Sequence, residues 1–207
     1  DNELSGSIPT SLGNLVKLYE LDLSGNQLSG DVPANFVNLV KLCEPDSQTF
    51  PCSAGYELDL GYNRLSVPAT EPPASFLAIK DPDWFTTQWQ SGFFPNSTGG
   101  VMLSHSGRML ITVPSGAAGV NFYLYLTPLR GYGHPSSELY FVGHSLDLSA
   151  FDTLGNPITQ FILPINIRFA YHENELGAVR EESLGLYYWN STTNQWEDAA
   201  TTCPNGI

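Results

Sequence analysis

The feature that most constrains the fold of this chain is an internal repeat of 24 residues near its start. Asn2 is followed by Asn26 at that distance, and the Ile-Pro pair at 8–9 returns as Val-Pro at 32–33. A period of this size is typical of proteins in which each unit buries its apolar face against the next one. The period therefore predicts stacked units that share one continuous core.

Within the repeat, residues 18–33 combine a short strand pattern with a turn. Leu21 and Leu23 lie two residues apart, so their side chains point to the same face of a strand. Asn26 follows where the backbone is expected to bend. Leu58 begins another copy 13 residues beyond position 45, where a strict period from Leu21 would place it. The displacement indicates an insertion that loops out of the stack.

These motifs resemble the leucine-rich repeat family in its 24-residue form, which is common in plant receptors and bacterial surface proteins. The resemblance implies a solenoid of short parallel strands, with a binding surface and no reaction. Residues 71–80 read as a helix that starts at a Pro-Pro pair and has one apolar side. Because the last apolar layer of a repeat array must be covered, we expect residues 70–90 to form a helical cap.

The resemblance places the binding surface on the concave face, on strand residues between the buried leucines. The residues expected on this face are Glu20, Asp22, Ser24, Glu57 and Asp59. Stacked strands lie about 4.8 Å apart, so these side chains are expected to align as an acidic strip with few cations nearby. Such a strip attracts a basic protein surface or a divalent cation. The alternative is that the strip only maintains solubility.

The charge balance limits the classes of partner. The chain has 8 Lys and Arg against 21 Asp and Glu, which gives a net charge of −13. So few cations form no basic patch for nucleic acid or anionic lipid. Apolar runs are far shorter than the roughly 20 residues of a membrane span. We therefore expect a protein partner, or assembly with other copies or with the rest of a larger chain, and neither nucleic acid nor membrane insertion.

The three cysteines predict a disulfide. Cys43 and Cys52 enclose a short polar loop and match no zinc-ligand spacing. We expect them to be bonded to each other, with Cys203 left over for a partner beyond Ile207. Because the repeat also begins in mid-unit at Asp1, both ends of the chain are expected to continue in a longer protein. The cysteines and the type of repeat predict an extracellular or cell-surface location.

After a Gly-, Pro-, Asn- and Ser-rich boundary the apolar period becomes 2, which is typical of strands. The clear strand runs are 109–113, 122–126, 165–169 and 184–189. Turn clusters at 152–157 and 190–194 separate such runs, and the second predicts a hairpin that ends at Trp196. Short strands with this punctuation favour an antiparallel sandwich.

Gly99-Gly100 and the Val-Pro-Ser-Gly-Ala run at 113–117 resemble the zonula-occludens and netrin-receptor (ZU-five) domain, over residues 99–200. Some members of that family cut themselves at a His-Phe-Ser site, which this chain lacks. His144-Ser145 could represent a degenerate form of it. Neighbouring strand residues point to opposite faces, however, so His144 is badly placed to act as the base for Ser145.

The sequence thus predicts an α+β multidomain fold. A leucine-rich repeat solenoid with a helical cap is expected over 1–90, a linker over 91–98 and an antiparallel β-sandwich over 99–207. We expect a non-catalytic interaction or adhesion module in which the repeats bind a partner and the sandwich is a spacer or assembly unit. The alternative is a self-processing or assembly domain of a larger surface protein. No catalytic residue, metal site or cofactor is expected.

Overall fold

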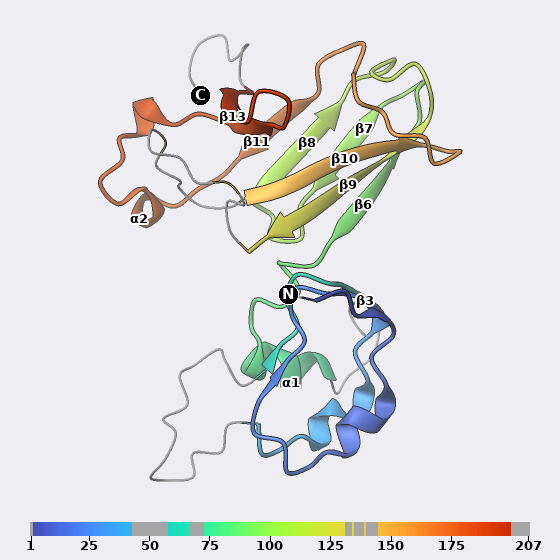
Figure 1. The fold of residues 1–207 in the computed structure, drawn as a ribbon, viewed down its shortest axis with the longest axis vertical. Helices are drawn as coiled ribbons and strands as arrows, with labels where there is room; N and C mark the ends of the chain where they lie inside the picture. The colour runs from blue at the N-terminus through green and yellow to red at the C-terminus, as the bar shows by residue number, and fades with distance from the viewer. Residues whose placement is uncertain are drawn as a thin grey trace. The chain divides into compact units, whose positions relative to one another are not determined.

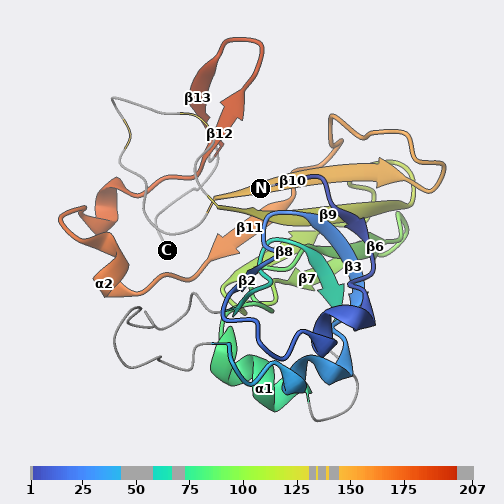
Figure 2. The same ribbon diagram turned by 60° about the horizontal axis from the view of Figure 1, so that its bottom comes forward.

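The computed structural model describes residues 2–42, 58–66, 73–130, 134, 139 and 145–199. These residues form mostly short strands in five small sheets, with little helix (Figure 1, Figure 2). The chain divides into two compact units. The first contains residues 1–130 and 146–169, and the second contains residues 131–145 and 170–207.

The repeats at the start of the first unit form short parallel strands joined by turns. In chain order the elements are β1 (Ser5–Gly6), η1 (Thr10–Asn14), β2 (Leu21–Asp22), β3 (Gln27–Asp31), η2 (Ala34–Asn38), β4 (Leu58–Asp59) and β5 (Arg64–Ser66). β3 lies between β1 and β5 in one parallel sheet. β2 pairs with β4 in another, with Leu21 opposite Leu58 and Asp22 opposite Asp59.

One apolar cluster fills the interior of this part. Its buried members are Ile8, Leu28, Val32, Phe36, Leu39, Leu42, Leu58, Leu60, Leu65, Leu77 and Trp84. Leu21 and Leu23 pack against the same cluster, so the leucines of successive repeats share one core, as their spacing predicts. Leu77 belongs to the helix α1 (Pro73–Lys80), which therefore also contributes to this core.

The predicted fold class is wrong. The solenoid with a helical cap expected over residues 1–90 does not form, and the described part of the chain consists of several separate small sheets with little helix. The parallel pairings of the described repeats are divided between two sheets, β1-β3-β5 and β2-β4, so these strands do not join into one continuous solenoid sheet. Gly25 and Gly30 take positive φ values of 63° and 80°, and Pro9 and Pro33 lead into the 3₁₀ helices η1 and η2.

Buried side-chain amides join one repeat to the next. The Oδ1 atom of Asn26 accepts a hydrogen bond from the backbone N–H of Leu4 at 3.1 Å, and its Nδ2 donates to the carbonyl of Leu23 at 3.0 Å. The Oδ1 atom of Asn63 likewise accepts from the N–H of Leu28 at 3.0 Å. Its Nδ2 also reaches back to Leu23 at 2.9 Å. Each Asn therefore satisfies backbone groups that would otherwise be buried without partners.

Gln88 continues this set of amides after the last repeat. Its Oε1 atom accepts from the N–H of Leu65 at 2.9 Å, and its Nε2 donates to the carbonyl of Leu60 at 3.0 Å. Leu65 lies two residues after Asn63, as Leu28 lies two residues after Asn26. Gln88 thus occupies the place that the Asn of a further repeat would take. Gln88 lies within residues 70–90, the stretch expected to be a helical cap, but it comes from the turns after α1 and not from a helix.

The rest of the first unit forms two three-stranded sheets. Their strands are β6 (Gln90–Phe94), β7 (Gly100–Leu103), β8 (Met109–Val113), β9 (Phe122–Leu129), β10 (Ser145–Asp152) and β11 (Asn166–Phe169). The orders are β10-β9-β6 and β11-β8-β7, and Figure 1 shows β10 and β9 side by side. A second apolar cluster, which includes Phe94, Ile111, Leu124 and Ala150, draws on both sheets.

The second unit contains α2 (Glu173–Leu176), η3 (Glu181–Ser183) and a hairpin of β12 (Tyr187–Asn190) and β13 (Gln195–Asp198). In the hairpin, Trp189 lies opposite Trp196. The ring of His134 stacks on that of Trp189 with 3.9 Å between centroids. The predicted hairpin is therefore confirmed, although its second strand ends at Asp198 and not at Trp196.

The strand runs predicted over 109–113, 122–126 and 165–169 correspond to β8, β9 and β11 and are confirmed. The run predicted over 184–189 is confirmed only in its second half, because β12 begins at Tyr187. A single β-sandwich over 99–207 is not what forms. β6 precedes that range and lies mostly in the stretch expected to be a linker, while β12 and β13 belong to the other unit. Period-2 patterns identify strands, but they do not say which strands share a sheet. The exact domain limits stay a prediction.

Cys43, Cys52 and Cys203 lie outside the described residues, so the predicted disulfide stays a prediction. Glu57 and His144 also lie outside them. Within the described ranges, no helix is both long and apolar enough to cross a membrane.

Replacing Gln88 by Leu tests the role of the last amide. The change leaves the N–H of Leu65 and the carbonyl of Leu60 without their buried partner, and each unsatisfied group costs about 1–3 kcal/mol. We expect the free energy of unfolding in urea to fall by roughly 2–6 kcal/mol. The matched change at the exposed Gln27 should alter it by less than about 0.5 kcal/mol. Equal effects of the two changes would contradict the assignment.

Candidate functional site

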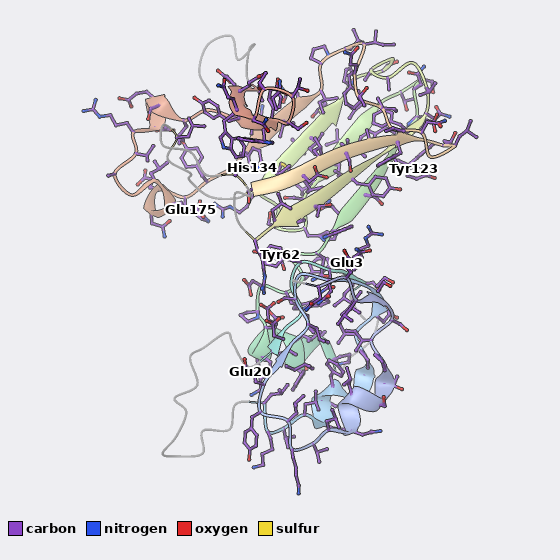
Figure 3. All side chains as sticks on the ribbon, in the orientation of Figure 1. Glu3, Glu20, Tyr62, Tyr123, His134 and Glu175 are labelled. Atoms are coloured by element: carbon purple, nitrogen blue, oxygen red, sulfur yellow. The ribbon has the colours of Figure 1, made fainter. Side chains whose placement is uncertain are left out.

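The structure brings two residues of the predicted acidic strip together. Asp22 of β2 and Asp59 of β4 are partners in the parallel pairing, which places their side chains next to each other. Glu20 is exposed just before β2. Figure 3 labels Glu20 and Tyr62, both on the part of the first unit that contains the repeats. Glu57 lies outside the described residues, so its place in the strip stays a prediction.

Ser24 does not face solvent as the strip requires, because it is only 3% exposed. Its hydroxyl donates a hydrogen bond to Asp22, and its backbone N–H donates to the same Oδ1 atom at 2.9 Å. The N–H of Gly61 donates in the same way to Asp59 at 3.0 Å. Each carboxylate therefore stabilises a turn by accepting a hydrogen bond from the backbone N–H two residues later in the chain. The Asp-x-Ser and Asp-x-Gly spacings are the sequence signals for this role.

A cation lies in the strip, contrary to the sequence-based expectation. Arg130, directly after β9, forms an ion pair with Asp59 and donates a hydrogen bond to the hydroxyl of Ser24. Its guanidinium also lies 5.3 Å from the centre of the Tyr62 ring. The strip is therefore partly neutralised. Arg130 is 71 residues from Asp59 in sequence, and no local pattern indicates such a contact.

Arg130 also affects the protonation of its neighbours. Burial acts to raise the pKa of Asp22, but the hydrogen bonds from Ser24 and the positive charge of Arg130 outweigh it, so this pKa is lowered. Burial raises the pKa of Tyr62, and the charge of Arg130 opposes that change. Asp22 is thus a carboxylate and Tyr62 a neutral phenol at neutral pH.

Tyr62 has a backbone conformation that tyrosine rarely adopts. Its φ is 56°, in the left-handed region, and Gly25 has nearly the same φ of 63° at the matching place of the preceding repeat. Both residues come directly before the repeat Asn, which is Asn63 in one case and Asn26 in the other. A side chain in this conformation costs about 1–2 kcal/mol. Alignment of the two repeats is the sequence signal that identifies Tyr62.

A further carboxylate, that of Asp81, is buried behind the strip. It is 5% exposed, and its Oδ2 atom accepts a hydrogen bond from the N–H of Leu60 at 2.6 Å. Burial, together with the negative charges of Asp59 and Asp83, raises its pKa to about 7, although the bond from Leu60 opposes the change. Asp81 meets a backbone group at the end of the repeats, as Gln88 does, which gives it a structural role.

The remaining chemistry of the described residues offers no metal centre, since no group of three or more His, Cys, Asp and Glu side chains gathers in them. Ser145 and Asp147 both belong to β10. The suggestion of a degenerate self-cleavage site at His144-Ser145 stays a prediction, because His144 is not among the described residues.

Comparison with known proteins supports the repeat. The family model described as Leucine Rich Repeat matches residues 17–39, which include β2, Asp22 and Asn26. Leucine-rich repeats generally mediate protein–protein interaction, so the match indicates a protein-interaction module. The resemblance to the ZU-five domain over residues 99–200 is not supported. No curated protein and no solved structure matches the chain.

Replacing Arg130 by Gln tests the charge network. Because the charge of Arg130 lowers the pKa of both Asp22 and Tyr62, its loss should raise both values. NMR titration of the Asp22 carboxyl and ultraviolet titration of Tyr62 measure them. The same change at the exposed Arg168 is the control and should move neither. If the two pKa values stay at their wild-type positions, Arg130 does not occupy the strip in solution.

Replacing Asp81 by Asn tests the buried carboxylate. A raised pKa in the folded state means that folding takes up a proton, so stability from this group is present below about pH 4 and lost as the pH rises to about 7. We expect the free energy of unfolding of the variant, measured in urea, to rise relative to that of wild type over this pH window. At pH 8 the variant should be more stable by about 1–3 kcal/mol. A stability difference independent of pH would contradict the burial of a titrating Asp81.

Proposed function

We propose that this chain is a non-catalytic interaction module that binds a protein partner through its repeats. The proposed binding face consists of Glu20, Asp22, Asp59, Tyr62 and Arg130. The proposal extends the general role of leucine-rich repeats to particular residues. It also includes the expected extracellular or cell-surface location, for which the support is the similarity to 24-residue repeats of surface proteins.

The observation that carries the proposal is the conformation of Tyr62. A residue that costs stability in the left-handed region, where the preceding repeat has Gly25, needs a reason to be there. Its ring lies beside the guanidinium of Arg130, which is about one-third exposed. Tyr and Arg are, with Trp, the residue types enriched among the residues that dominate the energetics of protein interfaces. Strain stored at such a pair supports recognition and not packing alone.

The charges of the face indicate the chemistry of the partner. Arg130 compensates Asp59, while Glu20 and Asp22 remain exposed carboxylates on a chain of net charge −13. A partner with a basic surface would gain from this arrangement, and its association would slow as salt rises. A positively charged partner would also avoid the electrostatic repulsion that the acidic chain exerts on an acidic partner.

The groups of the binding face have uses other than catalysis. Asp22 and Asp59 hold turns through hydrogen bonds to backbone N–H groups, and Arg130 forms an ion pair. A catalytic nucleophile would need a base within hydrogen-bond reach, and the bonds formed here hold the backbone instead. We therefore propose that the chain is not an enzyme. The two three-stranded sheets would then act as a spacer or assembly unit.

Replacing Tyr62 by Gly separates binding from folding. Gly relieves the strain, so the variant should be as stable as wild type or more stable, by up to about 1 kcal/mol. Loss of the ring should nevertheless weaken capture of the partner at least about tenfold, which corresponds to 1.4 kcal/mol. The measurement is a pull-down from the native cell surface at several salt concentrations, followed by titration of the captured protein.

Glu20→Ser, with Glu182→Ser as its matched control, tests the charge of the face. Glu182 is exposed and lies in the second unit, so only the change at Glu20 should slow association and reduce its dependence on salt. If wild type, Tyr62→Gly and Glu20→Ser capture the same proteins at equal strength, the repeats do not bind through this face. The aromatic hairpin of β12 and β13 is then the next surface to test.

A further inference from the structure

A row of aromatic rings, three of them exposed and one half-buried, lies on the outward side of the sheet β10-β9-β6. Phe93 of β6 is opposite Tyr123 of β9, with 5.1 Å between ring centroids. Tyr125 follows Tyr123 along β9 at 6.5 Å. Phe151 of β10 meets the ring of Tyr125 edge-on at 5.8 Å. These four residues form the aromatic row, and Figure 3 labels Tyr123 among them.

The exposure of the row is a consequence of strand alternation. The neighbouring residues Phe94, Phe122 and Leu124 point inward and fill the core of the two sheets. Phe93, Tyr123 and Tyr125 point outward and are 49%, 39% and 38% exposed. Single exposed apolar side chains need no explanation, but a contiguous group of them marks a binding surface.

A pocket of about 120 Å³ lies at the end of the row and is lined by Arg64, Trp89, Gln90, Ser91, Tyr125 and Thr127. The guanidinium of Arg64 lies 4.0 Å from the centre of the Trp89 ring, and this cation–π contact holds it in place. Ser91 is opposite Tyr125 in the strand register, and Thr127 follows Tyr125 by two residues. Their hydroxyl groups therefore lie on the same side of the sheet as the aromatic row.

The composition of this surface indicates the class of ligand. The outward residues at 91, 93, 123, 125 and 127 are aromatic or carry a hydroxyl group, and the aliphatic Leu129 follows them at the end of β9. A sugar ring presents a C–H face that stacks on an aromatic ring and a rim of hydroxyl groups that bond to hydroxyl and guanidinium groups. The separations of 5–6.5 Å between rings are close to the length of one sugar unit. Rings fixed on paired strands need little ordering when a ligand binds.

Charge decides between classes of oligosaccharide. The chain has a net charge of −13, and Asp147 adds an exposed carboxylate on β10 of the same sheet. This field repels acidic polysaccharides and nucleic acids. Arg64 can donate hydrogen bonds to neutral oxygen atoms without a ligand charge. The negative charge of the chain therefore favours an uncharged oligosaccharide over an acidic one.

We propose that the aromatic row and its end pocket bind a neutral oligosaccharide. Successive sugar rings stack on Tyr123 and Tyr125, and the hydroxyl groups of the terminal sugar bond to Arg64 in the pocket. This site is separate in its residues from the proposed protein-binding face and does not depend on it. A module with both binding sites would attach to a polysaccharide through one and bind a protein through the other.

Calorimetric titration of the full chain with cellohexaose, xylohexaose, mannohexaose and chitohexaose tests the proposal. At least one of these neutral sugars should bind and change the fluorescence of Trp89. Tyr125→Ala should raise Kd at least about tenfold, or 1.4 kcal/mol, and Phe93→Ala should raise it as well. Tyr187→Ala is the control, since Tyr187 is as exposed as Tyr125, at 39% against 38%, and lies in the other unit. Its affinity should equal that of wild type.

The proposal is overturned if none of the four sugars binds, or if Tyr125→Ala and Phe93→Ala both bind as tightly as wild type. Preferential binding of polygalacturonate, abolished by Arg64→Met, would also overturn it and assign the pocket to an acidic ligand. Thermal unfolding of each variant shows that it is folded. Tyr125→Phe provides a further measure, because it keeps the ring and should retain most of the affinity.

Discussion

The hydrogen bonds of three buried amides, those of Asn26, Asn63 and Gln88, are the interactions on which the first part of the structure depends. Short parallel strands leave backbone groups inside the apolar cluster, and a group buried without a partner costs about 1–3 kcal/mol. Each amide offers one acceptor and two donors, and thereby serves backbone groups of more than one segment. Gln88 and the carboxylate of Asp81 complete this arrangement where the repeats stop. The leucines can pack in this cluster because these hydrogen bonds satisfy the backbone groups that are buried with them.

The binding face follows from the same short strands. Pairing of β2 with β4 sets Asp22 beside Asp59, and two neighbouring carboxylates repel each other unless other groups compensate them. Backbone N–H groups and Arg130 provide this compensation. Tyr62 completes the cluster in a left-handed conformation. The face therefore combines an acidic edge with an Arg–Tyr pair, which suits recognition of a protein with basic groups.

The aromatic row has a different chemistry, although it belongs to the same unit. Its members are rings and hydroxyl groups on paired strands, and its pocket contains a guanidinium held against Trp89. Binding there would depend on stacking and hydrogen bonds, and little on salt. Binding at the acidic face would depend strongly on salt. The two surfaces can therefore be distinguished by ionic strength as well as by substitution.

The sequence by itself determined the repeat, the facing of Leu21 and Leu23, most of the strands and the hairpin at Trp196, because these follow from local period and turn chemistry. It did not determine which strands share a sheet, so the solenoid and the single sandwich were wrong expectations. Nor did it indicate Arg130 beside Asp59, or Arg64 on Trp89. Contacts between residues far apart in the chain leave no local pattern, and only the tertiary structure decides which charges and rings meet.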